Sequence, residues 1–425
     1  MNSVGLHVFA QLLKVLPMDT FEAIAAKYPL KPCNSRKFTP RDYFTAMLFG
    51  QLSGASPLRE VVLGMAIAGE KIVHTGAKFM KRTTLAYNNN HSNPLIFKDF
   101  YFAVLEQFRC ELGHKKQAQF DKPLFSIDSS TISLGCKLYG WANFRRHKKG
   151  IKVHTGLSNE LGLPEVVVMT VVKKADVRCA EAVIEQLPQE AIIVMDRGYN
   201  DYRLFNWIDK RNTVFVTRLK KNAAHTPLDE STMVGEGNNW SDYHITFTGE
   251  AAKEVCGEKK WRVVRYFDTI EDRWFEFITN DFDSPAETIA ELYRERWKVE
   301  LFFKKLKQNT VVKAYFGTTE NAVRSQVWIA LIATLLLQIL FQRSRDHRYF
   351  STFNWVMRQS LWKYIRLEQI LNPSILGRDE PEASCEESPQ MELPFGKVGP
   401  LKPKICVFSF KSTNYFFDAQ IRFGQ

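Results

Sequence analysis

The chain has 425 residues and a formal net charge of +12, and 45% of its residues are hydrophobic. This length exceeds the size at which a single core stops growing, so two or three structural units are expected, and the apolar content excludes wholesale disorder. The positive charge favours a polyanionic partner, either nucleic acid or an acidic membrane surface, although a solvated basic face gives the same excess.

The seven cysteines are scattered, odd in number and contain no C-x-x-C pair. Neither a disulfide framework nor a zinc site follows from them, and a reducing cytosol fits best. The N-terminus lacks the basic start and clean apolar stretch of a signal peptide. The charge-free run from Val327 to Phe341 is shorter than the roughly 20 residues of a membrane-spanning helix, so we expect a buried core helix and no membrane contact.

The first 115 residues show helical patterns. Pro40 to Ser53 carries apolar residues at helical spacing, Pro57 to Ala68 predicts a second helix, and Ser92 to Phe108 contains a third. Basic residues near these helices favour a DNA-reading module, but a plain helical cap is equally compatible and no recognition helix stands out. These residues are Lys78, Lys81, Arg82 and Lys98.

From about residue 122 the pattern changes to strands that alternate with helices. The expected strands are 123–134, 150–157, 165–172, 191–195 and 213–218, and the expected helices are 175–187 and 201–210. Three strands, a helix, a strand, a helix and a strand make a mixed α/β layer fold.

Residues 221–282 have the pattern of a β-rich insertion. A Gly/Asn/Ser-rich loop is expected at 235–241, followed by strands at 244–248, 261–267 and 274–279. Ser284 is then expected to cap a long helix that runs to about Gln308, with Pro285 at its first position and Glu287 completing a capping box. Beyond about 345, an acidic, Pro-containing linker and two short strands, 405–410 and 415–417, are expected.

Two aspartates stand in apolar strand patterns. Asp128 lies in FSID, and Asp196 ends IIVMD. A carboxylate at the end of a buried strand is costly unless it is paired or bound to a metal. Taken singly, each aspartate also fits the start of an ordinary turn after a strand.

The predicted long helix carries Tyr293, Arg296, Glu300 and Lys307. At about 100° per residue these four fall in one stripe about 60° wide, along the margin of the apolar face. The plain alternative is a solvated stripe with pairing between Arg296 and Glu300 at i,i+4. An ordinary helix would not often place a tyrosine and a distant lysine in the same line, which favours a functional site.

Three carboxylates can hold two Mg²⁺ ions, because hard divalent cations prefer oxygen ligands. Two such ions about 4 Å apart stabilise the attacking and leaving oxygens of an in-line phosphoryl displacement. Arg296 and Lys307 are then expected to clamp phosphates, and Tyr293 to donate to a phosphate oxygen or to stack on a sugar or base.

A basic stretch with interleaved aromatic residues follows Asp128. Such a mixture suits a nucleic-acid backbone with some base stacking, while a solvated hairpin remains the alternative. The basic residues are Lys137, Arg145, Arg146, Lys148, Lys149 and Lys152, and the aromatic ones are Tyr139, Trp141 and Phe144.

Together these residues resemble the DDE transposases of bacterial insertion sequences. The chain is similar to the insertion-sequence-four-like branch, marked by Y-x2-R-x3-E-x6-K on the catalytic helix, which here reads YRERWKVELFFKKLK from Tyr293 to Lys307. The first acid motif is FSIDSSTI and the second is IVMDRGYND. Residues 37–61 resemble the helical leader of such enzymes, so the resemblance covers roughly residues 1–345.

The resemblance implies a ribonuclease-H-like catalytic core, residues 122–220 and 283–345, interrupted by a β-rich insertion at 221–282. It implies a helical N-terminal domain for DNA binding at 1–115, and leaves 346–425 as a candidate for dimerisation or DNA contact. Asp128, Asp196 and Glu300 are implied as catalytic residues and ligands of two Mg²⁺ ions, with Mn²⁺ as a substitute. Arg145, Arg146, Lys148 and Lys149 join the stripe residues as DNA contacts.

The implied reaction is cut-and-paste transposition in the bacterial cytoplasm, at the nucleoid. A dimer pairs two double-stranded ends with terminal inverted repeats, water attacks the phosphodiester, and the freed 3′ hydroxyl attacks target DNA. In relatives that form a hairpin, an insertion-domain tryptophan holds a flipped base, for which Trp240, Trp261 and Trp274 are candidates here. The alternatives are a ribonuclease-H-like nuclease and a decayed or domesticated DNA-binding repressor.

Overall fold

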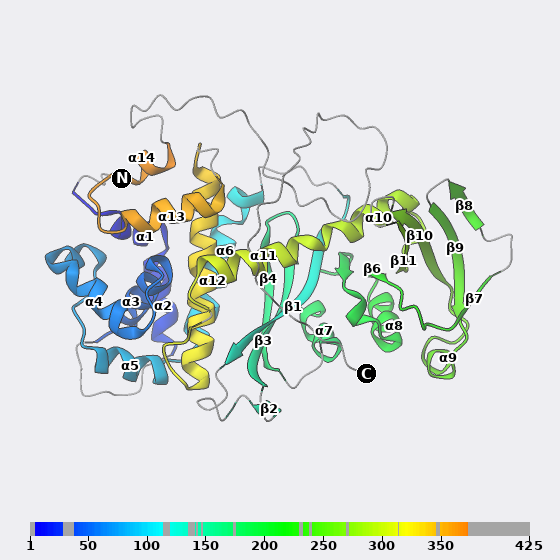
Figure 1. The fold of residues 1–425 in the computed structure, drawn as a ribbon, viewed down its shortest axis with the longest axis horizontal. Helices are drawn as coiled ribbons and strands as arrows, with labels where there is room; N and C mark the ends of the chain where they lie inside the picture. The colour runs from blue at the N-terminus through cyan, green and yellow to red at the C-terminus, as the bar shows by residue number, and fades with distance from the viewer. Residues whose placement is uncertain are drawn as a thin grey trace, which may run out of the picture.

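The N-terminal helices and the last three described helices gather at one end of the molecule, and a long twisted sheet with helices along it forms the rest (Figure 1). The predicted acidic linker and the strands expected at 405–410 and 415–417 lie outside the described residues. The computed structural model describes residues 5–28, 38–113, 120–134, 141, 143–145, 148–172, 176–228, 233–237, 240–268, 272–312, 314–345 and 349–372.

The helices predicted at 40–53 and 57–68 are confirmed, and most of the third lies within α6. Helix α3 begins with a capping box, in which Thr39 Oγ1 accepts from the N–H of Asp42 and Asp42 Oδ2 accepts from the N–H of Thr39. The N-terminal helices are α1 (Val8–Val15), α2 (Met18–Ala26), α3 (Pro40–Ser53), α4 (Leu58–Ile67), η1 (Gly69–Thr75), α5 (Arg82–His91) and α6 (Leu95–Gly113).

The apolar run near residue 330 lies in α12 (Glu320–Arg343), which is buried among α3, α5 and α6. It is the one described helix that is long and apolar enough to cross a membrane, but 89% of its apolar window is buried inside the protein. The expected core helix is therefore confirmed. Helices α13 (Phe350–Ser360) and α14 (Leu367–Leu371) follow it, and the N–H of Val8 donates to the carbonyl of Lys363 at 3.0 Å, so both ends of the described chain share one helical core.

The described residues form one 11-stranded sheet in the order β2-β3-β1-β5-β6-β11-β10-β9-β7, with β4 beside β3 and β8 beside β9. The two pairs β1–β5 and β5–β6 are parallel, and every other pair is antiparallel. The strands are β1 (Leu124–Leu134), β2 (Asn143–Arg145), β3 (Lys148–Ser158), β4 (Leu163–Val171), β5 (Ile192–Met195), β6 (Val214–Arg218), β7 (His225–Pro227), β8 (Met233–Gly237), β9 (Trp240–Phe247), β10 (Trp261–Asp268) and β11 (Arg273–Thr279).

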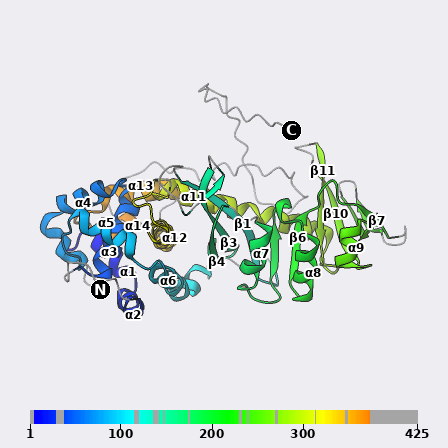
Figure 2. The ribbon, with the colours of Figure 1, turned by 90° about the horizontal axis from the view of Figure 1, so that it is seen from below.

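Helices cover both faces of this sheet (Figure 2). On one face, Phe125 and Ile127 of β1 share a core with α7 (Val177–Ile184), α8 (Tyr202–Lys210) and α9 (Glu250–Cys256). On the other face, Leu124 packs with Ile289 of α10 (Ala286–Glu295), and α11 (Trp297–Asn309) continues along β1. Because side chains alternate along a strand, Asp128 points to the α10–α11 face.

Within residues 221–282, the strands predicted at 244–248, 261–267 and 274–279 are confirmed, but two other parts of this segment were not predicted. The stretch expected as a loop at 235–241 contributes to β8 and β9, because pairing with a neighbouring strand outweighs its Gly/Asn/Ser composition. The run from Glu250 to Cys256 is helix α9.

The predicted long helix exists, with two corrections. No capping box forms at Ser284, because α10 begins after Pro285 without a side-chain cap and the N–H of Ser284 donates to Asp281 Oδ1 at 3.0 Å. The helix also tightens at Arg296, where the N–H of Val299 donates to the Arg296 carbonyl three residues back and divides α10 from α11.

Candidate active site

Asp128 lies in β1, with its carboxylate facing α11. Its Oδ1 accepts the N–H of Ser129 at 2.7 Å. Burial raises the pKa of Asp128 to about 6, and the neighbouring charges of Glu300 and Asp196 add to the rise, while the Ser129 N–H and Arg296 oppose it. Asp128 is therefore a half-buried acid whose pKa is raised by burial and by two nearby carboxylates.

Asp196 follows β5, the parallel neighbour of β1, whose Met195 pairs with Ile127. The carboxyl ends of parallel strands meet at one edge of a sheet, so Asp196 comes beside Asp128. Its side chain is exposed, and Oδ2 accepts the N–H of Gly198 at 3.4 Å at the start of η3 (Arg197–Tyr199).

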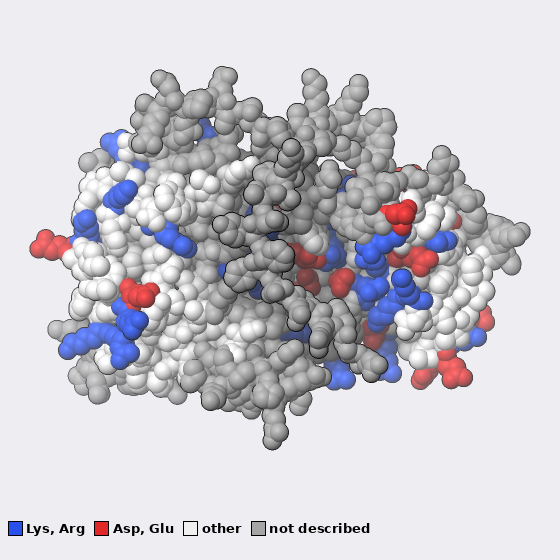
Figure 3. All heavy atoms as spheres, viewed as in Figure 1, with Lys and Arg blue, Asp and Glu red and all other residues white. Residues whose placement is uncertain are grey.

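Glu300 comes to the same edge from the first turn of α11. Its Oε1 lies 2.7 Å from Nη1 of Arg296, and the two side chains are 35% and 12% exposed. Figure 3 shows acidic side chains gathered beside basic ones on this face, over the region between β1 and β6. The structure thus brings the three sequence-predicted acids into one neighbourhood.

Carboxylate oxygens are the donors that hard divalent cations take, so this donor set fits such a cation. Across the described part of the chain, however, no three His, Cys, Asp or Glu side chains are drawn together tightly enough to hold a metal ion. The Glu300 carboxylate is held by Arg296, and Asp196 points to solvent. Joint ligation by the three acids therefore requires their side chains to close up.

The remaining stripe residues differ in their surroundings. Tyr293 is 4% exposed and packs against Phe277, with 4.8 Å between ring centroids, so it is a core residue and does not lie on an open polar stripe. Burial raises the pKa of its hydroxyl. The guanidinium of Arg296 lies 5.6 Å from the Tyr293 ring centroid, and Lys307 is half-buried in the last turn of α11.

Only part of the predicted basic stretch lies within the described residues. Arg146 and the side chains of Arg145, Lys148 and Lys149 lie outside the described residues. Lys152 is described, and it is not on a solvated basic surface. Its side chain is 16% exposed, and its Nζ donates to both oxygens of Asp176, at 3.0 and 2.9 Å.

Asp176 belongs to a polar network that the sequence did not indicate. Ser129 Oγ donates to Asp176 Oδ1 at 2.6 Å, and His154 Nδ1 lies 3.6 Å from the same oxygen. Burial alone would raise the pKa of Asp176, but the hydrogen bonds from Ser129 and Lys152 lower it. The network lies on the face opposite Asp128 and holds the residue whose N–H binds the Asp128 carboxylate.

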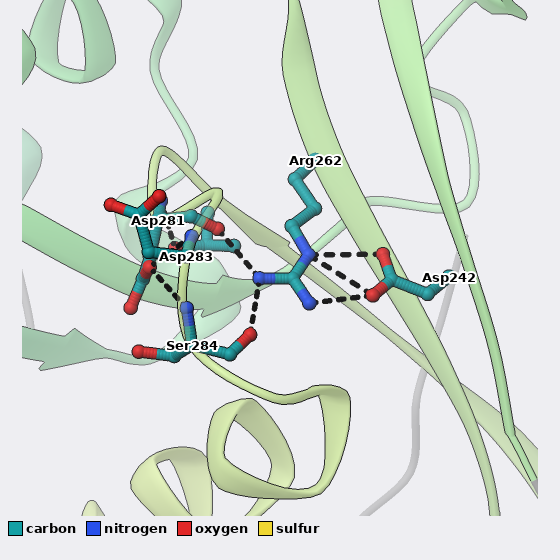
Figure 4. Close-up of polar contacts among 6 residues, drawn as sticks. Asp242, Arg262, Asp281, Asp283 and Ser284 are labelled. Atoms are coloured by element: carbon teal, nitrogen blue, oxygen red, sulfur yellow. Dashed lines mark hydrogen bonds and ion pairs between the residues drawn. The ribbon is translucent and has the colours of Figure 1, made fainter. Parts of the chain in front are cut away.

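A buried ion pair joins β9 and β10 next to the segment that leads into α10 (Figure 4). Arg262 of β10 donates from Nη2 to Asp242 Oδ2 at 2.5 Å, and the two side chains are 3% and 2% exposed. Its Nη1 donates to the carbonyls of Asp281 and Ser284, at 2.9 and 2.7 Å. Arg262 therefore joins two insertion strands to the segment that leads into α10.

The three candidate tryptophans differ in their exposure to solvent. Trp261 is fully buried and Trp240 is half-buried against the α10 core. Trp274 is 43% exposed, and the guanidinium of Arg265 lies 4.9 Å from its ring centroid. Of the three described tryptophans, Trp274 is the most exposed, and the ring of Phe267 also lies beside it, with 5.3 Å between centroids.

Comparison with known proteins gives two family matches. A family profile described as the transposase DDE domain matches residues 119–336, just over half of the chain. A second profile, for a domain of unknown function (DUF4372), matches residues 4–78.

Individual relatives carry related names. One named as a transposase for insertion sequence element IS5377, from Geobacillus stearothermophilus, is 32% identical over 239 residues, which cover 56% of this chain and 62% of the relative. One named as a transposase for insertion sequence element IS4SA, from Synechocystis sp., is 28% identical over 249 residues, covering 58% and 67%. The chain thus spans about three fifths to two thirds of the length of these relatives.

Among solved structures, a piggyBac transposase synaptic complex with hairpin DNA is 8% identical to this chain, with a TM-score of 0.40. The alignment covers 88% of this chain and 80% of that one.

Proposed function

The chain belongs to the transposase DDE domain family, and from that premise we propose that it moves an insertion sequence by divalent-metal-dependent cleavage and strand transfer of DNA. The observation that carries the proposal is the position of three acids at one edge of the sheet: Asp128 in β1, Asp196 directly after the parallel neighbour β5, and Glu300 in the first turn of α11, which packs on β1. Three acids from two strands and a helix converge there, and the ordinary turn explanation for each aspartate does not account for that convergence.

We propose a ribonuclease-H-like catalytic core for residues 122–220 and 283–345. The strand order β4-β3-β1-β5-β6, with β1, β5 and β6 parallel, supports this assignment. The insertion then occupies residues 221–282, between the second aspartate and the helix that carries the glutamate.

Asp128, Asp196 and Glu300 are the residues that would hold two divalent ions, Mg²⁺ with Mn²⁺ as a substitute. When bound, such ions stabilise the attacking and leaving oxygens of an in-line phosphoryl displacement. The raised pKa of Asp128 fits this role, because a bound cation offsets the cost of a half-buried carboxylate that lies near two others.

Arg296 holds Glu300 in place and lies where a phosphate oxygen can accept from its remaining N–H groups. The ring of Tyr293 packs against the Arg296 guanidinium. Lys307 adds a positive charge in the last turn of α11. Trp274 is the residue we assign to stacking on an extruded base, because its ring is exposed next to Arg265.

The partners follow from the same proposal: double-stranded DNA with terminal inverted repeats, target DNA, and a second copy of the chain on paired ends. The N-terminal helices and the basic stretch around Arg145, Arg146, Lys148 and Lys149 supply further DNA contacts in this proposal. The protein acts in the bacterial cytoplasm, at the nucleoid.

A strand-transfer assay tests this function against a simple nuclease. The full chain is incubated with Mg²⁺, precut ends bearing the inverted repeat that flanks the gene, and a supercoiled target plasmid. We expect joined products that disappear with EDTA. A nicked target without joining would indicate a nuclease, and binding without any strand breakage would indicate a repressor.

A further inference from the structure

Two arginines from neighbouring strands lie on one buried ring beside the candidate active site. The guanidinium of Arg218, at the end of β6, lies 4.4 Å from the ring centroid of Phe275, and that of Arg273, at the start of β11, lies 4.5 Å from the same centroid. Phe275 is 1% exposed, so both guanidinium groups pack against a buried ring. A third arginine, Arg197, directly follows Asp196.

Arg218 lies within electrostatic range of both other arginines. Burial lowers the pKa of Arg218, and the charges of Arg273 and Arg197 lower it further, while Tyr293 opposes the change. Like charges held together in a partly desolvated place raise the free energy of the protein. An anion bound among them relieves that cost, and planar guanidinium groups bind phosphate oxygens in pairs.

The position of the arginines relates them to the acids. Tyr293 lies within electrostatic range of Arg296, Asp196 and Arg218. The cations therefore continue the line Glu300–Arg296–Tyr293 across β6 onto insertion strand β11. Figure 3 shows Lys and Arg side chains gathered beside the acidic ones on this face, over the region of β6 and β11.

We propose that Arg197, Arg218 and Arg273 form a binding site for the sugar-phosphate backbone of the DNA strand that enters the carboxylate site. We call this set the arginine row. Its donors are guanidinium groups on strands and on the turn after β5. We expect them to contact phosphate oxygens and not base edges, so that binding does not depend on the DNA sequence. The inference rests on the proposed function for its ligand, and it adds Arg218 and Arg273, which lie outside the sequence motifs.

The salt dependence of DNA binding tests the arginine row. The probe is a fluorescein-labelled duplex of mixed sequence in EDTA, so that binding is measured without cleavage. The test variant is the double substitution Arg197→Gln/Arg273→Gln, which keeps Arg218 on Phe275. The matched control is Lys210→Gln/Lys253→Gln, two exposed charges on α8 and α9 at the other face.

For the test variant we expect roughly tenfold weaker binding than wild type at low salt, and a slope of log K against log salt that is smaller by about 2, since each lost phosphate contact removes about 0.9. The control should keep the wild-type slope. An unchanged slope in the test variant, or an equal change in the control, overturns the proposal.

A second measurement uses the wild-type protein and therefore needs no folded variant. Phenylglyoxal modifies exposed arginines, and the duplex should protect Arg197 and Arg273 while leaving Arg203, which is exposed on α8, reactive. Equal reactivity of all three in the presence of DNA contradicts the proposal. Both tests work without catalysis, so a protein that binds through the row but joins no strands would refute the proposed function alone.

Discussion

Arg296 and Glu300 form an ion pair across one turn of α11, with 2.7 Å between Nη1 of the arginine and Oε1 of the glutamate. Fully exposed i,i+4 pairs contribute only about 0.3–0.5 kcal/mol to stability, and in this pair the Arg296 side chain is 12% exposed. Its importance lies in its place, because the same guanidinium lowers the pKa of Asp128 and lies over the ring of Tyr293. The pair sets where the third acid points.

Replacement of the arginine tests this role. Arg296→Met should reduce strand cleavage by about 10- to 100-fold while shifting the melting temperature little, because Glu300 loses its orientation and phosphate loses a donor. Single-turnover cleavage of an inverted-repeat duplex measures the loss. Arg324→Met is the matched control, since Arg324 forms a similar i,i+4 pair with Glu320 on α12, away from the acids. Equal losses in both variants would refute a specific role.

The half-buried carboxylate of Asp128 should make the free protein less stable at neutral pH. Its pKa is about 6 in the folded chain against an ordinary value of 3.8, so the folded state binds more protons between these values, and stability falls as pH rises through them. Asp128→Asn should therefore stabilise the metal-free protein by on the order of 2–3 kcal/mol above pH 6, and by progressively less toward pH 4.

Denaturant unfolding at a series of pH values, in EDTA, measures this difference. Glu291→Gln on α10 is the control and should give no such pH-dependent gain. A variant that is equally or less stable than wild type at pH 7 would show that the Asp128 carboxylate is not strained by its surroundings.

The Asp176 network should hold Ser129 in place through Lys152. Lys152→Met removes two charged hydrogen bonds and should cost roughly 1.5–3 kcal/mol of unfolding free energy. The pKa of Asp176 is lowered in the folded protein, so its stabilisation is present above the ordinary value of 3.8 and is lost as pH falls below it. The deficit of the variant should therefore shrink in acid, as pH-dependent unfolding will measure, whereas Lys253→Met should show no deficit at any pH.

Arg262 should be the most sensitive residue of the insertion. Arg262→Met leaves Asp242 charged and buried, which should cost about 3–5 kcal/mol. The double variant Arg262→Met/Asp242→Leu should regain most of that loss, because no unpaired charge remains. Thermal unfolding of both variants measures the difference, and a double variant as unstable as the single one would contradict the buried-charge explanation.

Local patterns predicted much of the fold because their causes are local. Helix α3 is set by its capping box and helical spacing, and β5 by a short apolar run next to Asp196. The tightened turn at Arg296 was not predicted, and a continuous helix projection therefore put Tyr293 at a polar margin, whereas the structure buries it against Phe277. The burial of Tyr293 depends on tertiary packing against Phe277, which a helical projection of one segment does not include.

The parts of the site that escaped prediction depend on strand register. Ser129 pairs with His154, and Lys152 with Thr131, so these side chains share the face under α7, where Asp176 meets them. The arginine row likewise requires β6 beside β11, two strands far apart in the chain. Spacing within one strand does not reveal its neighbour, so neither set could be assembled from the sequence.

The central claim is that Asp128, Asp196 and Glu300 act together in DNA cleavage. The most direct measurement is single-turnover cleavage of a labelled duplex carrying the element's inverted repeat, over a Mg²⁺ titration, for wild type, Asp196→Asn, Glu300→Gln and the control Glu291→Gln. We expect Asp196→Asn and Glu300→Gln to lose cleavage at every Mg²⁺ concentration while still binding the duplex, and Glu291→Gln to match wild type. Full cleavage by either acid variant would contradict the claim.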